Sequence, residues 1–337
     1  MRQFIEKVIS GKDLTRSEAH GVMISIMEGK ASDALISAML VALKIKGESV
    51  GEISGFSDAM LEKAEKVVVS GSNLVDTCGT GGDSLNTFNI STTAAFIAAG
   101  AGVRIAKHGN RSISSKSGSA DVLEELGINI NLDVKEVSRC IEETGIGFIF
   151  APMAHKAMKY VAGVRKELGI RTVFNILGPI TNPAMASGRV LGVYDAGLID
   201  IMVGALKNLG VKRAYVISSE NGMDEFSTTS KIRAARLMNG EIEKIVIDPV
   251  DYGFTMSDTG DLKGGDASLN AKILEDILSG GIKGPMRDSA VFNAAAAIVT
   301  GKVADRLEDG IELAVGSIDS GRALVKLNDL IDCSNKK

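Results

Sequence analysis

Apolar residues recur at intervals of three and four, rather than two, from the first residue to about residue 67. Such spacing predicts consecutive amphipathic helices and no strand. Two helix starts are indicated by a hydroxyl residue followed three positions later by a glutamate, Thr15 with Glu18 and Ser49 with Glu52. That pattern is typical of a capping box. We therefore expect residues 1–67 to form a small all-helical domain.

One of the expected helices, residues 31–46, is apolar on more than one face. A helix that packs on a single core needs only one apolar stripe. The excess apolar positions indicate a second contact, and we expect another subunit to provide it.

After residue 67 the pattern changes to short β-rich runs, each followed by a Gly-rich loop and an Ala-rich helix. The runs are NLVDTC, VRIAKHG, IGFIFAP, RVLGVY and RAYVISS. This alternation predicts an α/β domain with a mostly parallel sheet and surrounding helices, extending over residues 68–337. The residues from 264 onward are again helical in pattern, and we expect them to form the outer layer of that domain.

A further helical segment, at about residues 165–185, contains the sequence GPITNP. Its two prolines and its glycine predict a rigid connection. The segment either rejoins the helical domain or forms a hinge between the two domains.

Composition narrows the class of protein. A formal net charge of -4 without any Lys/Arg-rich arm argues against nucleic acid as the main ligand. Three scattered cysteines are too few for a disulfide framework or a zinc cluster, so a reducing cytoplasm is the expected location. The N-terminus does not resemble a signal peptide, and we expect no segment to span a membrane.

The first chemistry-bearing motif is DTCGTGGD, residues 76–83, directly after a predicted strand. Its glycines allow backbone N–H groups to approach an anion. Hydroxyl residues then open the next helix in TFNISTT, residues 87–93, where the helix N-terminus favours negative charge. Either half alone is equally consistent with a tight turn or an N-cap, but together they favour a phosphate or diphosphate site.

The second motif is KHGNRSISS, residues 107–115, again after a strand and followed by a helix that opens at Gly118-Ser119-Ala120-Asp121. Its cations, amide and hydroxyls match the acceptor oxygens of a diphosphate. A solvated polar loop is the alternative, but strand ends of α/β folds are where ligands bind. His108 lies among cations that favour its neutral form, so we interpret it as a binding residue.

Two further features carry less information on their own. The adjacent carboxylates Asp224 and Glu225 follow a predicted strand and suit Mg²⁺, although acidic pairs usually occupy solvated turns. Beside two phosphate loops they become a candidate magnesium site. Arg165, in VAGVRKELG, is indistinguishable by pattern from a surface cation.

The motifs DTCGTGGD, NIST, KHGNRSISSKSGSADVLEELG, GPITNP and DEFS together resemble the anthranilate phosphoribosyltransferase family. The likeness extends over nearly the whole chain, including GGDASLNAKIL, MRDSAVFNAAAAI and IDSGRA. It implies a magnesium-dependent enzyme of tryptophan biosynthesis that joins phosphoribose to anthranilate. It also implies a homodimer formed through the helical domains, with the active site between the two domains of each chain.

The resemblance also assigns residues. Phosphoribosyl diphosphate would be held by Gly79, Gly82, Asp83, Thr87, Asn89, Ile90, Ser91, Thr92, Lys107, His108, Gly109, Asn110, Arg111, Ser112, Ile113, Ser114, Ser115 and Ser119. Anthranilate would be bound by Gly79, His108, Asn110 and Arg165, and two Mg²⁺ ions by Ser91, Asp224 and Glu225. Lys107, Asp83 and Asn110 would take part in catalysis.

Two other activities on the same fold remain alternatives. A pyrimidine-nucleoside phosphorylase binds free phosphate and a nucleobase, and its phosphate loop is not expected to read KHGNRSISS. A non-catalytic relative that binds nucleic acid should have an extended basic surface and need not retain the acidic pair. This chain is acidic and contains Asp224 and Glu225.

Overall fold

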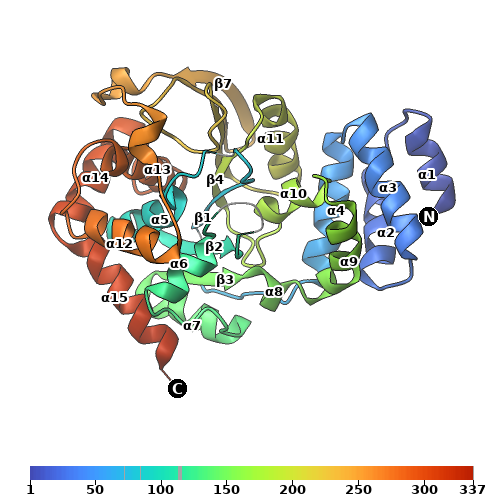
Figure 1. Ribbon diagram of the computed structural model, residues 1–337, viewed down its shortest axis with the longest axis horizontal. Coiled ribbons are helices and arrows are strands. Elements are labelled where there is room, and N and C mark those ends of the chain that lie inside the picture. The colour runs from blue at the N-terminus through green and yellow to red at the C-terminus, as the bar shows by residue number, and fades with distance from the viewer. Residues whose placement is uncertain (72, 84, 113–115, 337) are drawn as a thin grey trace.

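The N-terminal part of the protein is helical (Figure 1). The structure is a computed structural model that describes residues 1–71, 73–83, 85–112 and 116–336. The helices of this part are α1 (Arg2–Ile9), α2 (Arg16–Met27), α3 (Asp33–Lys46) and α4 (Val50–Lys63), and they gather at the right of Figure 1. Both predicted capping boxes are present, with Thr15 and Ser49 as the N-caps of α2 and α4. The helical prediction for this part is confirmed, because the local pattern already satisfies the backbone at the helix ends.

A seven-stranded sheet fills the larger part of the molecule, with the strand order β3-β2-β1-β4-β5-β6-β7. The first five strands are parallel, as predicted. The bounds are β1 (Leu74–Gly79), β2 (Arg104–Gly109), β3 (Ile146–Phe150), β4 (Gly188–Gly192), β5 (Arg213–Ser219), β6 (Ile232–Met238) and β7 (Glu241–Ile247).

The last two strands, β6 and β7, are antiparallel and were not predicted. They form a hairpin through Asn239 and Gly240, which have φ values of 53° and 92°. An Asn-Gly pair is a strong signal for such a turn, so the sequence did contain the evidence. The strand β7 was not predicted because four of its first five residues are exposed, so its sequence lacks the alternation of a half-buried strand.

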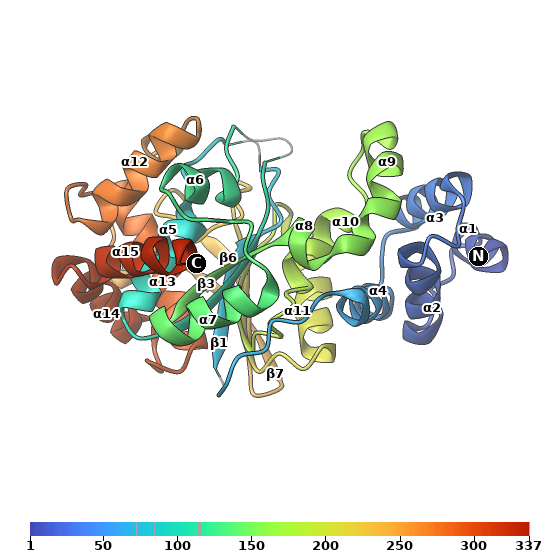
Figure 2. The same ribbon diagram turned by 90° about the horizontal axis from the view of Figure 1, so that it is seen from below.

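Helices cover both faces of the sheet (Figure 2). On one face, α5 (Ile90–Gly100) and α13 (Pro285–Thr300) pack on the strands, and α15 (Arg322–Asn335) contacts β3. The other C-terminal helices, α12 (Ala267–Leu278) and α14 (Leu307–Asp319), pack on these helices. The outer-layer prediction for the C-terminal third is thus correct in part only, because α13 is buried along almost its whole length. The remaining helices are α6 (Ser119–Glu125), α7 (Val134–Thr144), α8 (Ala151–Ala154), α9 (Lys159–Leu168), α10 (Phe174–Leu177) and α11 (Ile199–Asn208).

The other face of the sheet shares an apolar core with the N-terminal helices. Alternation along β5 divides its residues between the two faces: Tyr215 and Ile217 belong to the core with α5 and α13, whereas Ala214 and Val216 belong to the second core. That second core also includes residues of α2, α3, α4, α9, α10 and α11. The segment at about 165–185 therefore packs with the helical part, although the exact division of the chain into domains stays a prediction.

Strand order locates the region where a ligand is expected. The connection from β1 leads to β2 on one side, while β4 lies on the other side of β1. Ligands of open α/β sheets bind beyond the carboxyl ends of strands at such a reversal of order. No helix among the described residues has the length and apolar character needed to cross a membrane.

Glu52 is an unusual feature of the helical part, because its carboxylate is fully buried. One oxygen accepts from the Leu14 backbone N–H at 3.0 Å, and the other from the Ser49 N–H and the Lys46 ammonium, each at 2.8 Å. Every partner is a donor. The charge is therefore matched on all sides, and the carboxylate ties the start of α4 to the segment before α2.

Glu52→Gln is expected to lower the free energy of unfolding by about 2 kcal/mol, since the amide group turns a donor toward a donor in a buried place. Urea unfolding followed by circular dichroism measures this. The control is Glu62→Gln, an exposed carboxylate beside His20, for which we expect a change within about 0.5 kcal/mol. Equal effects of the two substitutions would contradict the structural role of Glu52.

Candidate active site

A cleft of about 340 Å³ lies at the carboxyl ends of the parallel strands. Its walls are the loops after β1 and β2, the start of α5, Tyr194 after β4, and the turn between β5 and β6. Arg171, just before α10, and Asn175, within α10, close another side. The two predicted phosphate motifs and the acidic pair, which are up to about 150 positions apart in the chain, therefore meet in one cleft.

The glycine loop after β1 folds closely over the acidic pair. The Gly81 N–H donates to Asp224 Oδ2 at 2.7 Å, and the Thr80 N–H donates to the Gly192 carbonyl at 2.9 Å. A Cβ added at Gly79 would lie 2.3 Å from Asp224 Oδ2. Glycine is needed here for close approach, which is the property that the sequence motif indicated.

The start of α5 forms the floor of the cleft beside the same carboxylates. The Ser91 N–H donates to Glu225 Oε1 at 3.3 Å. The ammonium of Lys107 donates to the Thr77 carbonyl at 2.5 Å and lies 3.4 Å from Ser91 Oγ. A helix N-terminus, a buried ammonium and glycine-loop amides thus line one space, and this combination favours an anion with several oxygens.

Asp224 and Glu225 are difficult to ionise in this environment. Burial, and then the nearby Asp83, raises the pKa of Asp224 to about 6. Burial, and then Asp224, raises the pKa of Glu225 to about 8, while Lys107 opposes the change. Each carboxylate is destabilised by another negative group, so a bound cation would relieve the repulsion.

The residues fit a divalent cation only with help from a ligand. Among the described residues, no three His, Cys, Asp or Glu side chains converge closely enough to hold a metal ion by themselves. Mg²⁺ typically takes one or two carboxylates together with phosphate oxygens and water. The acidic pair beneath the glycine loop, which is the predicted phosphate-binding loop, is consistent with that requirement.

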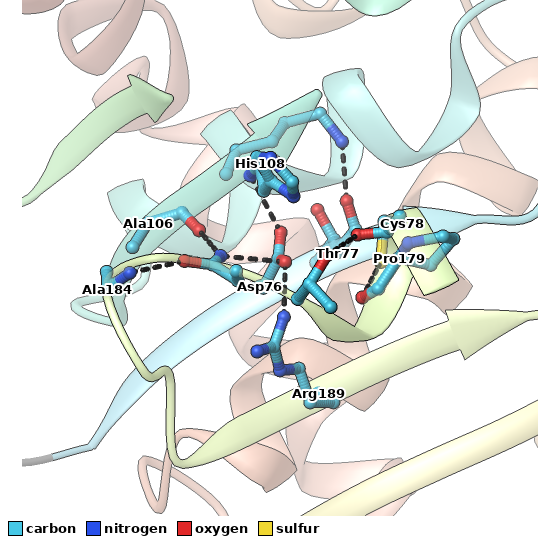
Figure 3. Close-up of polar contacts among 12 residues, drawn as sticks. Asp76, Thr77, Cys78, Ala106, His108, Pro179, Ala184 and Arg189 are labelled. Carbon is cyan, nitrogen blue, oxygen red and sulfur yellow. Dashed lines mark hydrogen bonds and ion pairs between the residues drawn. The ribbon is translucent and has the colours of Figure 1, made fainter. Parts of the chain in front are cut away.

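His108 follows Lys107 at the end of β2 and is buried next to His155, with 5.2 Å between the ring centroids. Burial and then His155 hold the pKa of His108 well below its ordinary value. The neutral form was predicted from neighbouring cations, but burial is the larger cause. His108 Nε2 has no hydrogen-bond partner among the described residues. Figure 3 shows its ring above the polar network around Asp76.

The remainder of the β2 loop turns back onto its own helix. The guanidinium of Arg111 forms ion pairs with Asp121 at 2.9 Å and Glu124 at 2.8 Å. The Ser119 hydroxyl donates to the Asn110 carbonyl at 3.4 Å. Arg111 therefore has its charge balanced by protein carboxylates, and of the two cations predicted in this motif only Lys107 is directed to the floor of the cleft.

The structure brings together nearly all of the predicted site residues. Those that line the cleft are Gly79, Gly82, Asp83, Thr87, Asn89, Ile90, Ser91, Thr92, Lys107, His108, Gly109, Asn110, Arg111, Ser112, Ser119, Asp224 and Glu225. Ile113, Ser114 and Ser115 lie outside the described residues. Arg165 does not line the cleft; it lies on α9, with its guanidinium carbon 5.5 Å from the centre of the Phe174 ring.

Sequence reasoning missed other residues of the cleft, notably Arg171 and Tyr194. The Arg171 guanidinium donates to the Gly82 carbonyl and stacks 4.3 Å from the centre of the Tyr194 ring. Asn270, from α12, donates to Asn89 Oδ1 at 2.9 Å. Arg171 and Tyr194 lie in segments without a recognised motif, so only the tertiary structure identifies them. Asn270 lies within GGDASLNAKIL, a motif of the resemblance to which no role in the site was assigned.

The sequence matches a known family over both parts of the chain. Residues 71–324 match the family described as "Glycosyl transferase family, a/b domain", and residues 2–64 match the "Glycosyl transferase family, helical bundle domain". The anthranilate phosphoribosyltransferase of Acetivibrio thermocellus is 51% identical over 335 residues, which is 99% of this chain and 97% of that protein. That of Alkaliphilus metalliredigens is 51% identical over 100% of this chain and 99% of its own.

Solved structures agree with these sequence matches. Anthranilate phosphoribosyltransferase from Thermus thermophilus superposes with a TM-score of 0.94 at 39% identity, covering 98% of this chain and 99% of that one. The Saccharomyces cerevisiae enzyme, solved in complex with phosphoribosyl diphosphate and Mg, gives a TM-score of 0.90 at 28% identity and covers 98% and 97% of the two chains.

Mg²⁺ is expected to raise the melting temperature more at pH 8 than at pH 6, because the cation binds carboxylates only after they lose their protons. Raised carboxyl pKa values also mean that, without metal, these two groups destabilise the fold as pH rises through about 6 for Asp224 and about 8 for Glu225. Thermal unfolding with and without millimolar Mg²⁺ at both pH values measures the effect.

The double substitution Asp224→Asn/Glu225→Gln is the control for this experiment. Without metal it should be at least as stable as the unsubstituted protein at pH 8, since two buried carboxyl groups that repel each other when ionised are removed. With Mg²⁺ it should show no additional stabilisation at either pH. A Mg²⁺ effect of equal size in both proteins would place the cation elsewhere.

Proposed function

The chain belongs to the anthranilate phosphoribosyltransferase family, a group of pentosyltransferases, and we propose that it transfers phosphoribose from phosphoribosyl diphosphate to the amine of anthranilate. The products are phosphoribosyl-anthranilate and diphosphate, and the reaction is a step of tryptophan biosynthesis. The observation that carries the assignment is the meeting, in one cleft, of a glycine loop, a helix N-terminus and Lys107 with a carboxylate pair.

Phosphoribosyl diphosphate is assigned to the space between the loops after β1 and β2. Backbone N–H groups of the glycine loop and of the first turn of α5 are the donors suited to its diphosphate. Side-chain donors come from Thr87, Asn89, Ser91, Thr92 and Lys107, and from the β2 loop. The predicted contacts of Ile113, Ser114 and Ser115 belong to this assignment as sequence-based expectations.

Magnesium is assigned to Ser91, Asp224 and Glu225, completed by oxygens of the diphosphate. When bound, the cation neutralises charge on the diphosphate. We propose two ions, because the carboxylates are adjacent in the chain yet contact different elements: Asp224 contacts the glycine loop, and Glu225 contacts the start of α5.

Catalysis on this assignment is stabilisation of the departing diphosphate. The amine of anthranilate is neutral at pH 7, so no protein side chain has to act as a nucleophile. Lys107 places its ammonium where charge develops, and its burial away from water strengthens that interaction. Asp83 and Asn110, at the two rims of the cleft, are assigned to orienting the ribose and the incoming amine.

Anthranilate is assigned to the side of the cleft formed by Gly79, His108 and Asn110. Nε2 of His108, which has no hydrogen-bond partner among the described residues, is assigned as the acceptor for the substrate amine. The carboxylate is assigned to Arg165, which has to approach the cleft from α9 for this contact. Arg171 already lines the cleft and is the competing candidate.

The protein is proposed to act as a homodimer in the cytoplasm. Apolar side chains remain exposed on the helical part, including Ile9 at 71% and Ile45 at 81% of their surface. Ala34 and Ala38 of α3 are exposed as well. This surface supports a contact between helical parts of two chains. The cytoplasmic assignment rests on the few cysteines and on the biosynthetic family.

A direct assay tests the function. Purified protein with phosphoribosyl diphosphate and Mg²⁺ should consume anthranilate, which is followed as loss of its fluorescence. Omission of Mg²⁺ and the Asp224→Asn/Glu225→Gln protein are the controls, and both should abolish most of the turnover. A folded protein that cleaves pyrimidine nucleosides with phosphate, and leaves anthranilate unchanged, would be a phosphorylase instead.

Arg165→Ala is expected to raise the KM for anthranilate by about tenfold to a hundredfold with little change in the KM for phosphoribosyl diphosphate, since a charge-assisted bond to the carboxylate is lost. Lys166→Ala, an exposed neighbour on α9, is the matched control and should leave both values unchanged. If Arg171→Ala produces the anthranilate-specific effect and Arg165→Ala does not, the carboxylate partner is Arg171.

Ile45→Glu is expected to convert the dimer into monomers, because a charge in an apolar interface has no partner. Sedimentation velocity gives the oligomeric state. Val325→Glu replaces an apolar side chain of α15 that is 52% exposed, and it should leave the dimer intact. A folded Ile45→Glu protein that stays fully dimeric would remove α3 from the interface.

A further inference from the structure

The strands β1 and β2 separate toward their carboxyl ends. Among the described residues, they pair only through Leu74 with Arg104 and Val75 with Ile105. By contrast, β1 pairs with β4 as far as Gly79, and β2 pairs with β3 as far as Gly109. The sheet therefore contains a fork between two otherwise well-paired strands, and the fork points toward the cleft.

Side chains replace the missing backbone ladder inside this fork. The His108 N–H donates to the side chain of Asp76, at 3.0 Å from Oδ1. The Ala106 carbonyl accepts from the side-chain amide of Asn182 at 2.7 Å. A continued parallel ladder would give both backbone groups partners on the backbone of β1. Figure 3 draws both bonds, and the one from His108 ends on Asp76.

Asn182 joins the two sides of the fork directly. Its amide nitrogen also donates to Asp76 Oδ2 at 2.8 Å, and its carbonyl oxygen accepts from the Ala184 N–H at 2.8 Å. Arg189 donates to the same Asp76 oxygen at 2.6 Å and balances its charge. Asp76, Asn182 and Arg189 are all buried. Arg189 Nε has no hydrogen-bond partner among the described residues, but both carboxylate oxygens of Asp76 and both polar atoms of the Asn182 amide are bonded, and a buried network of this kind restricts the geometry of the fork.

The fork lies directly beneath both proposed diphosphate-binding loops. The glycine loop begins immediately after β1, and the loop with Asn110 begins immediately after β2. The ammonium of Lys107 reaches across the fork to the Thr77 carbonyl of β1. The distance between the strand ends therefore sets the distance between the two loops.

We propose that Asp76 and Asn182 are positioning residues that hold the ends of β1 and β2 apart at the spacing a diphosphate requires. The proposal rests on the proposed function, since it takes the two loops to share one diphosphate. Neither residue lines the cleft, so both act through the loops that they support. Asn182 belongs to GPITNP, which gives that connection a role beyond rigidity.

Asn182→Ala tests the proposal, because it removes the link across the fork and leaves Asp76 paired with Arg189. We expect the affinity for inorganic diphosphate with Mg²⁺, measured by calorimetry, to fall by about tenfold or more, since misplacement of about 1 Å in a site can cost a hundredfold. The KM for phosphoribosyl diphosphate should rise in parallel, with a smaller change in kcat.

Thr144→Val is the matched control. Thr144 is buried before β3, and its hydroxyl bonds the Cys140 carbonyl at 2.8 Å, away from the cleft. This protein should lose stability but keep its diphosphate affinity and KM. Unchanged diphosphate affinity in folded Asn182→Ala, or an equal loss in Thr144→Val, would overturn the proposal.

Hydrogen exchange tests the fork without a substitution. In the unsubstituted protein the His108 amide should exchange as slowly as the neighbouring ladder amides, because Asp76 holds it. Rapid exchange at His108 would contradict the network. If the unsubstituted protein binds diphosphate but does not consume anthranilate, the proposed function fails, while the calorimetric test of the fork still applies.

Discussion

Close approach between the turn that carries Asp224 and the ends of β1 and β4 is the constraint on which this site depends. A Cβ at Gly192 would lie 1.5 Å from the Asp224 carbonyl oxygen, so no side chain is tolerated there. The same turn accepts a hydrogen bond from the glycine loop. Because backbone meets backbone, two carboxylates are fixed beneath the glycine loop, and the proposed anion site and the proposed cation site form one unit.

Electrostatics explains why this unit is poised to take a ligand. Burial raises the pKa values of Asp224 and Glu225 and lowers that of Lys107, so groups of both signs are held in a place that disfavours their charges. On the proposed function, a diphosphate with its cation would supply opposite charges to each and offset the cost of burying the protein groups.

The helical part is more than an appendage, because it shares an apolar core with one face of the sheet. Arg171, from a segment that packs in this core, contacts the glycine loop at Gly82. Movement of the helical part would therefore displace the contact between Arg171 and Gly82 at the cleft. This connection places the proposed anthranilate residue Arg165 and the two loops proposed to bind diphosphate on elements that contact each other.

Local sequence patterns determined much of this protein. Periodicity and residue type predicted the capped helices, the first five strands, and the two candidate phosphate motifs with their acidic pair. Those motifs together identified the family. The β6–β7 hairpin was not predicted, despite its Asn-Gly turn, because β7 has an exposed, charged pattern. Only the tertiary structure placed Arg171 in the cleft, Arg165 outside it, and Asp76 and Asn182 in a fork between strands. Those roles depend on contacts between segments as many as 113 positions apart, and no local pattern records such contacts.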